Sequence, residues 1–324
     1  MVAKSEAEMA VALAQRGRAG FGAVPAGLLR FARRKPLGAV GGVLVATLLV
    51  TGVLAPVIAP YGYDQRDYRA VLAQPSAQHL LGTDDVGRDI FSRIVYGARV
   101  SMIVSVGAVA LSVTLASAIG VVSGYYGGKV DLVVQRLVDT WICFPPVVLL
   151  LVFTAMFGIP LDPVDVLPGP LTWRLEPPEV RMAQVIVFMG LVLAGGSSRV
   201  VRGAVIGVRH HQFMEAAQAL GVPVRRVLLR YVLPNVLPTI LVLATVQLGS
   251  AILIEATISF LGFGIQPPIP TWGQMLSGNA TRFINRAPLL AVWPGLAISL
   301  AVFGFNMLGD ALRDVLDPRL RGGR

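Results

Sequence analysis

Few side chains in this sequence belong to the types that carry out catalysis or hold metals. The chain has three histidines, His79, His210 and His211, and one cysteine, Cys143. The histidines lack the spacing of metal ligands, and a lone cysteine cannot form an internal disulfide bond. No glycine-rich loop ending in Lys-Ser or Lys-Thr is present to hold a nucleotide phosphate. The sequence therefore predicts no metal, no cofactor and no ATPase site in this chain.

Glu215 is the residue best placed for an electrostatic contact with another protein. It opens the segment Glu215–Gly221, which has the pattern of a short helix with its own stop. Apolar and small side chains recur at helical spacing on one side, at Phe213, Ala216, Ala217, Leu220 and Val224. Gly221 can end the helix, and Pro223 can begin the next one. The pattern is typical either of a docking helix or of an amphipathic helix lying on a membrane surface.

Glu255 is the second ionisable residue of interest, because it interrupts an apolar stretch that otherwise runs from Tyr231 to Thr281. An ionisable group at membrane depth usually faces the interior of a helix bundle or a water-filled cavity. The alternative is a position near the outer interface. With Gln247 and Ser250, which precede it in the same stretch, Glu255 is a candidate for lining a translocation path.

Long runs without charge must position these residues. Of the 324 residues, 55% are hydrophobic and 14% are charged, whereas a soluble domain has about 25% charged residues. About 20 apolar residues cross a bilayer core, and six runs of roughly that size predict spans at about 37–60, 100–124, 138–157, 183–200, 236–262 and 288–309. We therefore expect an all-α, polytopic membrane protein. It has a tail over 1–35, a transmembrane domain over 36–309 with a coupling loop over 201–235, and a second tail over 310–324.

The distribution of Lys and Arg predicts the orientation, because short cytoplasmic loops are rich in them. They are concentrated in 1–35, in 201–235 and in the last residues, whereas the arginines at 66, 69, 88 and 93 stand among aspartates. Both tails and Glu215 are therefore expected in the cytoplasm. The first apolar run is longer than the core of a signal peptide, which favours an uncleaved helix. The net charge of +10 is scattered over membrane-flanking loops, which argues against nucleic-acid binding.

The segment around Glu215, with Leu233-Pro234 after it, resembles the EAA loop of ATP-binding-cassette importer permeases, the helix that docks into a cleft on the ATPase. Other stretches resemble the C-type permease of the dipeptide, oligopeptide and nickel group. They are His79–Asp84, Gly87–Asp89, Tyr96–Ser101, Gly124–Gly128, Ser259–Gly264, Gln266–Pro268, Asn306–Asp310 and Arg313–Arg319. The similarity covers about residues 30 to 320. It implies a MetI-like permease fold, with six transmembrane helices and a cytoplasmic coupling helix, in a bacterial inner membrane.

The resemblance also implies partners. A homologous B-type permease would complete the path within the membrane lipid. Two cytoplasmic ATPases would bind ATP and Mg, and an external binding protein would deliver the substrate. The residues implied in ATPase docking are Phe213, Glu215, Ala216, Ala217, Leu220 and Gly221. Short peptides are the expected substrate, and nickel complexes or glutathione are alternatives. The rival function is a gradient-driven secondary transporter, but no internal repeat is visible and Glu255 is the one buried ionisable candidate.

Two segments depart from the pattern of the group. Residues 158–182 form a longer external loop than the group has there, and this loop contains six prolines. It could cap the path, contact a binding protein or be an exposed insertion. In addition, Ala194–Ser198 replaces a stretch with Trp-Pro, which leaves the local shape of the fourth span open.

Overall fold

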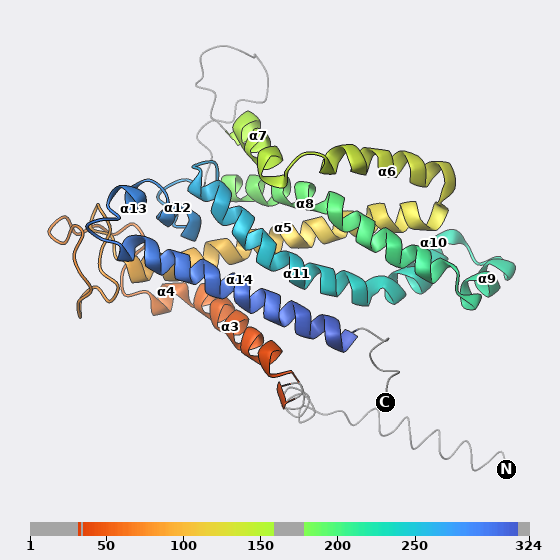
Figure 1. Cartoon of the computed structure of the whole chain (residues 1–324), viewed down its shortest axis with the longest axis horizontal. Coiled ribbons are helices and arrows are strands. Elements are labelled where there is room, and N and C mark those ends of the chain that lie inside the picture. Colours follow the sequence, from red (N-terminus) through yellow and green to blue (C-terminus); the bar gives the residue numbers. More distant parts are fainter. Residues whose placement is uncertain (1–31, 34, 159–177, 317–324) are drawn as a thin grey trace.

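The architecture is that of a computed structural model, which describes residues 32–33, 35–158 and 178–316 (Figure 1). Within these ranges the chain is helical, apart from loops and two isolated β-bridges, so the all-α prediction is confirmed there. The elements are α3 (Pro36–Val53), α4 (Ala55–Ile58), α5 (Ile90–Tyr126), α6 (Gly128–Ile142), α7 (Pro146–Gly158), α8 (Pro178–Arg209), α9 (Gln212–Ala219), α10 (Val224–Val227), the π-helical turn η1 (Leu228–Val232), α11 (Leu233–Phe260), α12 (Trp272–Leu276), α13 (Asn279–Arg282) and α14 (Leu289–Leu316).

Five helices of the described ranges are long and apolar enough to cross a membrane. They are α3, α5, Val180–Arg209 in α8, Val224–Phe260 through α10, η1 and α11, and Leu289–Val315 in α14. The helices α6 and α7 qualify together as a sixth candidate, although they meet at an angle of 83°. The sequence predicts one helix over about 138–157, whereas the structure has two helices that meet there at a sharp bend. Pro145 and Pro146 stand at the break, and a proline cannot donate the backbone bond that would continue α6.

Several helices run past the ends predicted from charge-free runs. α5 begins at Ile90 and not near residue 100, because the Asp89 side chain caps its first turn by accepting a hydrogen bond from Ser92 N. α8 continues to Arg209 and not only to about residue 200. α3 ends earlier than predicted, at Val53, before a segment that contains Pro56 and Pro60. Charged residues thus mark the limits of the apolar runs without ending the helices.

The two ends of the bundle carry different elements. α3 begins and α14 ends toward the end that carries α9, whereas the segment after α4, α12 and α13 gather at the opposite end (Figure 1). α5 finishes near the α9 end and α8 starts away from it, so α6 and α7 together carry the chain back across the bundle. The start of α3, the end of α14 and α9 therefore lie at the same end of the bundle, in keeping with an even number of crossings.

Glycines bring α5 and α8 close together. A Cβ at Gly120 would lie 2.7 Å from Ser198 O, and one at Gly124 would lie 2.9 Å from Val205 Cβ. The spacing of these two glycines is that of the small-xxx-small pattern by which membrane helices approach at their backbones. α5 packs along much of α8 in this way, and the pair forms the central contact of the bundle.

The segment between α11 and α14 folds back into the bundle. Trp272 is 1% exposed and its Nε1 donates to Ile94 O on α5 over 3.0 Å. A Cβ at Gly97 would lie 2.9 Å from the indole, and one at Gly273 would lie 2.1 Å from Ala256 O. Trp272 is therefore a wedge between α5 and α11, and it fits because the residues at 97 and 273 are glycines. This wedge fixes α12 against the end of the bundle opposite α9.

Candidate functional site

The helix predicted around Glu215 is present as α9, which ends at Ala219, and Gly221 provides the predicted stop just after it. The φ angle of Gly221 is +69°, a left-handed conformation that glycine adopts without steric cost. Gly221 N donates to Gln218 O over 3.0 Å, and Val222 N donates to Ala217 O over 3.1 Å. These two bonds are the pattern of a Schellman cap. Pro223 follows in an extended conformation and precedes α10.

One side of α9 is anchored in the bundle. Met214 is fully buried and packs in a cluster that includes Val205, Val227 and Val232. Ala217 is 5% exposed, on the same side of the helix. Ala217 was expected on the docking surface, but in this chain it faces inward. The bundle covers only one edge of the apolar side of α9, the edge that carries Met214 and Ala217.

The other edge of the stripe remains uncovered in the described chain. Phe213 is 40% exposed and Leu220 is 82% exposed, and Glu215 and Ala216 are exposed as well. The ring of His211 stacks on that of Phe213, with centroids 5.6 Å apart and an interplanar angle of 14°. We call Phe213, Glu215, Ala216 and Leu220, with His211, the α9 surface. It joins exposed apolar side chains to one carboxylate, and aromatic residues such as Phe213 are enriched in protein interfaces.

The anchor of α9 is continuous with two long helices. α10, η1 and α11 form one helical segment in which Val227, Val232 and Val236 are buried. The π-helical turn lies directly before Leu233-Pro234, where the proline lacks an N–H donor. α8 leads into α9 from the other side. A displacement of the α9 surface would therefore act on α8 and on α11.

An ion pair that the sequence did not reveal secures α8 near this end. Arg202 Nε donates to Asp131 Oδ1 on α6 over 2.6 Å, and Ser123 Oγ on α5 also bonds to Asp131. Gln135 Nε2 donates to Ser123 Oγ over 3.0 Å. Three helices thus share one polar cluster. Charged residues within a bundle pair with one another in this way to remain satisfied.

The three path candidates on α11 do not lie together. Glu255 is 1% exposed and accepts hydrogen bonds from Ser101 Oγ on α5 over 2.9 Å and from Ser259 Oγ over 2.8 Å. Gln247 is also buried, and its Nε2 donates to Ser197 Oγ on α8 over 2.8 Å. Ser250, by contrast, is exposed. The Glu255 carboxyl group faces the interior of the bundle, where it joins α5 to α11.

Parts of the sequence interpretation fall on residues outside the described ranges. They include residues 159–177 of the proline-rich segment, the first 31 residues of the N-terminal tail and the end of the C-terminal tail. The Ala194–Ser198 stretch, by contrast, lies within the unbroken helix α8. The fourth span is therefore a continuous helix through this stretch.

Comparisons with known proteins agree with the helical architecture. Residues 116–322 match the family described as binding-protein-dependent transport system inner membrane component. Residues 28–75 match the family described as the N-terminal TM domain of oligopeptide transport permease C. Both matches agree with the segments singled out in the sequence.

Individual proteins are similar over nearly the whole chain. A dipeptide transport system permease protein of Alkalihalophilus pseudofirmus is 37% identical over 89% of this chain and 88% of its own length. A glutathione transport system permease protein of Escherichia coli is 35% identical, over 90% and 89%. An oligopeptide transport system permease protein of Haemophilus influenzae is 32% identical, over 86% and 83%.

Proposed function

The chain belongs to the family of binding-protein-dependent transport system inner membrane components, and from that premise we propose that its α9 surface transmits ATPase movement to the translocation path. The protein is a permease subunit of an ATP-driven importer of peptides. It is a multi-pass membrane protein, and the inner membrane with cytoplasmic tails and α9 is its proposed location.

The observation that carries the proposal is the two-sided construction of α9. Met214 fixes the helix to the cluster of Val205 and Val227, while Phe213 and Leu220 stay exposed beside Glu215. A helix that is anchored on one side and uncovered on the other can pass a force from a partner into the bundle. Coupling between two sites requires such a shared element with two arrangements. Glu215 would pair with a basic group of the partner.

The remaining subunits follow from this assignment. We propose that a homologous B-type permease completes the path, that two cytoplasmic ATPases hold the ATP and Mg, and that an external binding protein supplies the substrate. This chain would then contribute transport and coupling without an ATPase site of its own. The family assignment also removes the support for a gradient-driven transporter.

Glutathione is the second candidate substrate, because a relative of similar coverage is a glutathione transport permease. Glutathione is itself a short peptide, so both candidates need a path that admits a small, charged backbone. Nickel complexes, the other alternative from the sequence, have no counterpart among the relatives named above.

Co-purification tests the proposal directly. The chain is tagged, expressed in its native host so that its own partners are present, and purified in mild detergent. We expect two ATPase copies and one second permease to accompany it, and peptide-stimulated ATP hydrolysis after reconstitution with the binding protein. Purification of this chain without an ATPase, together with peptide uptake driven by an ion gradient, would refute the proposal.

A further inference from the structure

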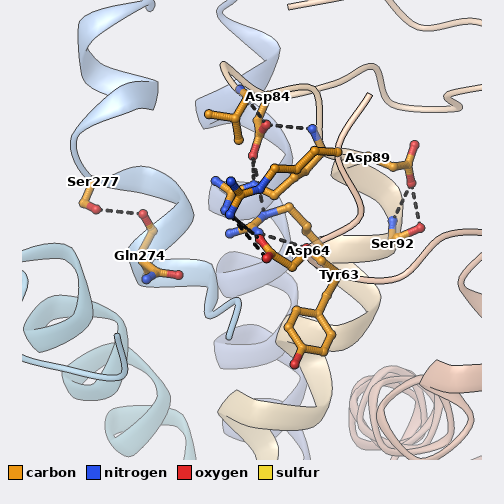
Figure 2. A network of polar contacts seen from close by, with 11 residues as sticks. Tyr63, Asp64, Asp84, Asp89, Ser92, Gln274 and Ser277 are labelled. Atoms are coloured by element: carbon orange, nitrogen blue, oxygen red, sulfur yellow. Dashed lines mark hydrogen bonds and ion pairs between the residues drawn. The ribbon is translucent and has the colours of Figure 1, made fainter. Parts of the chain in front are cut away.

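The end of the bundle opposite α9 holds a charged cluster around a buried arginine (Figure 2). Arg93, in the first turn of α5, is 4% exposed, and its Nη1 donates to Tyr63 O over 3.0 Å. Arg88 donates from Nε to Asp84 Oδ2 over 2.7 Å and lies 3.4 Å from Asp64 Oδ1. We call Asp64, Asp84, Arg88 and Arg93 the arginine cluster. It joins the segment before α5 to the start of that helix.

A cavity of about 170 Å³ opens between this cluster and the segment after α11. Its polar side is lined by two aspartates, two arginines and an amide, which are Asp84, Asp85, Arg88, Arg93 and Gln274, and its apolar side includes Ile90, Met275 and Leu290. A cavity of about 150 Å³ accommodates a ligand of the size of benzene. The space therefore suits one amino-acid residue and is too small for a whole peptide.

Gln274 gives the cavity an unsatisfied recognition group. Both amide atoms, Nε2 and Oε1, are shielded from solvent and have no hydrogen-bond partner among the described residues. In Figure 2 the side chain extends from α12 toward the cluster that holds Asp84 and Asp64. Its backbone carbonyl is occupied separately, by a hydrogen bond from Ser277 Oγ over 2.7 Å. Burying an amide without partners costs about 1–3 kcal/mol, so a ligand that satisfies it gains that difference.

The two aspartates and two arginines that line the cavity balance in charge, so a preference for an acceptor comes from N–H donors that the cluster leaves unused. Asp84 Oδ1 accepts from Val86 N over 3.0 Å and Arg88 N over 2.8 Å, and its Oδ2 accepts from Arg88 Nε. The carboxylate of Asp84 is thus occupied. The guanidinium of Arg93 has five N–H donors. Its Nε forms an ion pair with Asp84 Oδ2 at 3.8 Å, and one N–H of Nη1 donates to Tyr63 O, so the donors left for a ligand are on Nη1 and Nη2. Arg93 can therefore donate to a carboxylate in the paired geometry that guanidinium groups favour.

We propose that this cavity binds the C-terminal residue of a short peptide. The carboxylate would accept hydrogen bonds from Arg93, and the peptide N–H and C=O beside it would pair with the Gln274 amide. The side chain of that residue would lie against Ile90, Met275 and Leu290. The choice of a peptide as the ligand rests on the proposed function, but binding at this cavity is measured without ATP, partners or transport, so the two proposals can fail separately.

Calorimetric titration of the full-length chain in lipid nanodiscs tests the site with three probes. N-acetylglycine carries a carboxylate beside an amide, its amide derivative N-acetylglycinamide lacks the carboxylate, and acetate lacks the amide. We expect N-acetylglycine to bind and each of the others to bind at least about tenfold more weakly, since one ordinary hydrogen bond corresponds to about that factor. Equal binding of all three, or no binding of N-acetylglycine, would overturn the proposal.

Gln274→Leu is the decisive variant. It removes an amide that has no partner among the described residues, so the melting temperature should stay the same or rise, while N-acetylglycine binding falls at least about tenfold. Gln266→Leu is the matched control, because Gln266 lies in the same segment but its Nε2 already donates to Gly262 O over 2.7 Å. Its binding should be unchanged. If Gln274→Leu binds N-acetylglycine as the parent does, the site is refuted.

Arg93→Lys provides a second variant that keeps the charge. A lysine has no paired donors, so N-acetylglycine should bind at least about tenfold more weakly. The melting temperature reports whether this buried position tolerates lysine. If the variant folds and binds unchanged, the assignment of the carboxylate to Arg93 is wrong.

Discussion

Phe213 and Met214 are adjacent on α9 and lie in opposite environments, Phe213 at 40% exposed and Met214 fully buried. Consecutive residues on a helix are separated by about 100°, so one residue can belong to the bundle while its neighbour stays available to a partner. The division separates two experiments. Changes at Met214 test the anchor of the helix, and changes at its exposed neighbours test the contact with a partner.

Glu215→Lys should reduce ATPase retention. Glu215 is exposed, so its reversal should leave the melting temperature of the chain unchanged. At an interface, a like-charge contact can cost several kcal/mol. The measurement is the number of ATPase copies retained on purification, together with peptide-stimulated ATP hydrolysis in vesicles. Gln78→Lys, at an exposed residue in the segment between α4 and α5, is the control. Full ATPase retention in Glu215→Lys would contradict a role of this carboxylate in docking.

Gly221→Pro should uncouple ATP hydrolysis from import. A proline cannot adopt the φ of +69° and cannot donate the bond to Gln218 O. Gly221→Ala should have a milder effect, a loss of about 1 kcal/mol in the stability of the cap, because a left-handed conformation strains an alanine by that amount. Gly207→Ala is the control, since a Cβ there meets open space within α8. Normal coupling in Gly221→Pro would show that the Schellman cap is not needed to position α9.

Cysteine labelling should reveal the orientation. The native Cys143 is exposed and is first replaced by serine. Single cysteines at Glu215 and at Leu80, which is 56% exposed, are then treated in cells with an impermeant thiol reagent. We expect position 80 to react from outside and position 215 to be protected until the membrane is opened. The reverse labelling would invert the predicted topology.

Gly124→Leu should destabilise the bundle by at least about 2 kcal/mol, the usual scale of overpacking in a closely packed interface. Its Cβ alone would approach Arg202 O to 3.0 Å and Val205 Cβ to 2.9 Å. The thermal unfolding temperature in detergent measures the effect. Gly203→Leu is the control, because nothing lies within 4 Å of a Cβ there. Similar unfolding temperatures for the two variants would mean that α5 and α8 do not pack as described.

Glu255→Leu should lower stability by about 1–3 kcal/mol, because it leaves the hydroxyls of Ser101 and Ser259 without their acceptor. Glu255→Gln keeps one acceptor oxygen and should lose less. Unfolding temperature and peptide uptake are measured on the same preparations. A variant with unchanged unfolding temperature but altered substrate preference would instead favour a role of Glu255 in lining the path.

The spans could be predicted from the sequence because a bilayer core forces every backbone polar group to be satisfied within helices. The helix ends could not, because the charges that close the apolar runs are held within the helices. Arg202 pairs with Asp131, and Arg93 bonds to Tyr63 O, so α8 and α5 continue through them. Pro145 and Pro146 indicated a break between α6 and α7, but they gave no information on its angle of 83°.

The candidate site was predicted in part. Gly221 indicated the end of α9, because a glycine after an apolar helical stripe can form a left-handed cap. Met214 was missed, since the stripe through Phe213 and Ala217 gives no sign of which edge the bundle covers. The cavity beside Arg93 was missed for another reason. It depends on Gln274, which the chain brings to α5 only through the Trp272 wedge, and periodicity within one segment carries no information on such contacts.

The π-helical turn Leu228–Val232 determines where this chain can change length. A π turn holds one residue more than an α turn, so deleting one residue there would restore an ordinary helix and leave the α9 anchor and the buried face of α11 in phase. The same deletion between Gln247 and Glu255 would rotate everything after it by about 100°, carrying the Glu255 carboxyl group away from Ser101. In natural variants, insertions and deletions within the helical segment Val224–Phe260 should therefore occur mainly at η1.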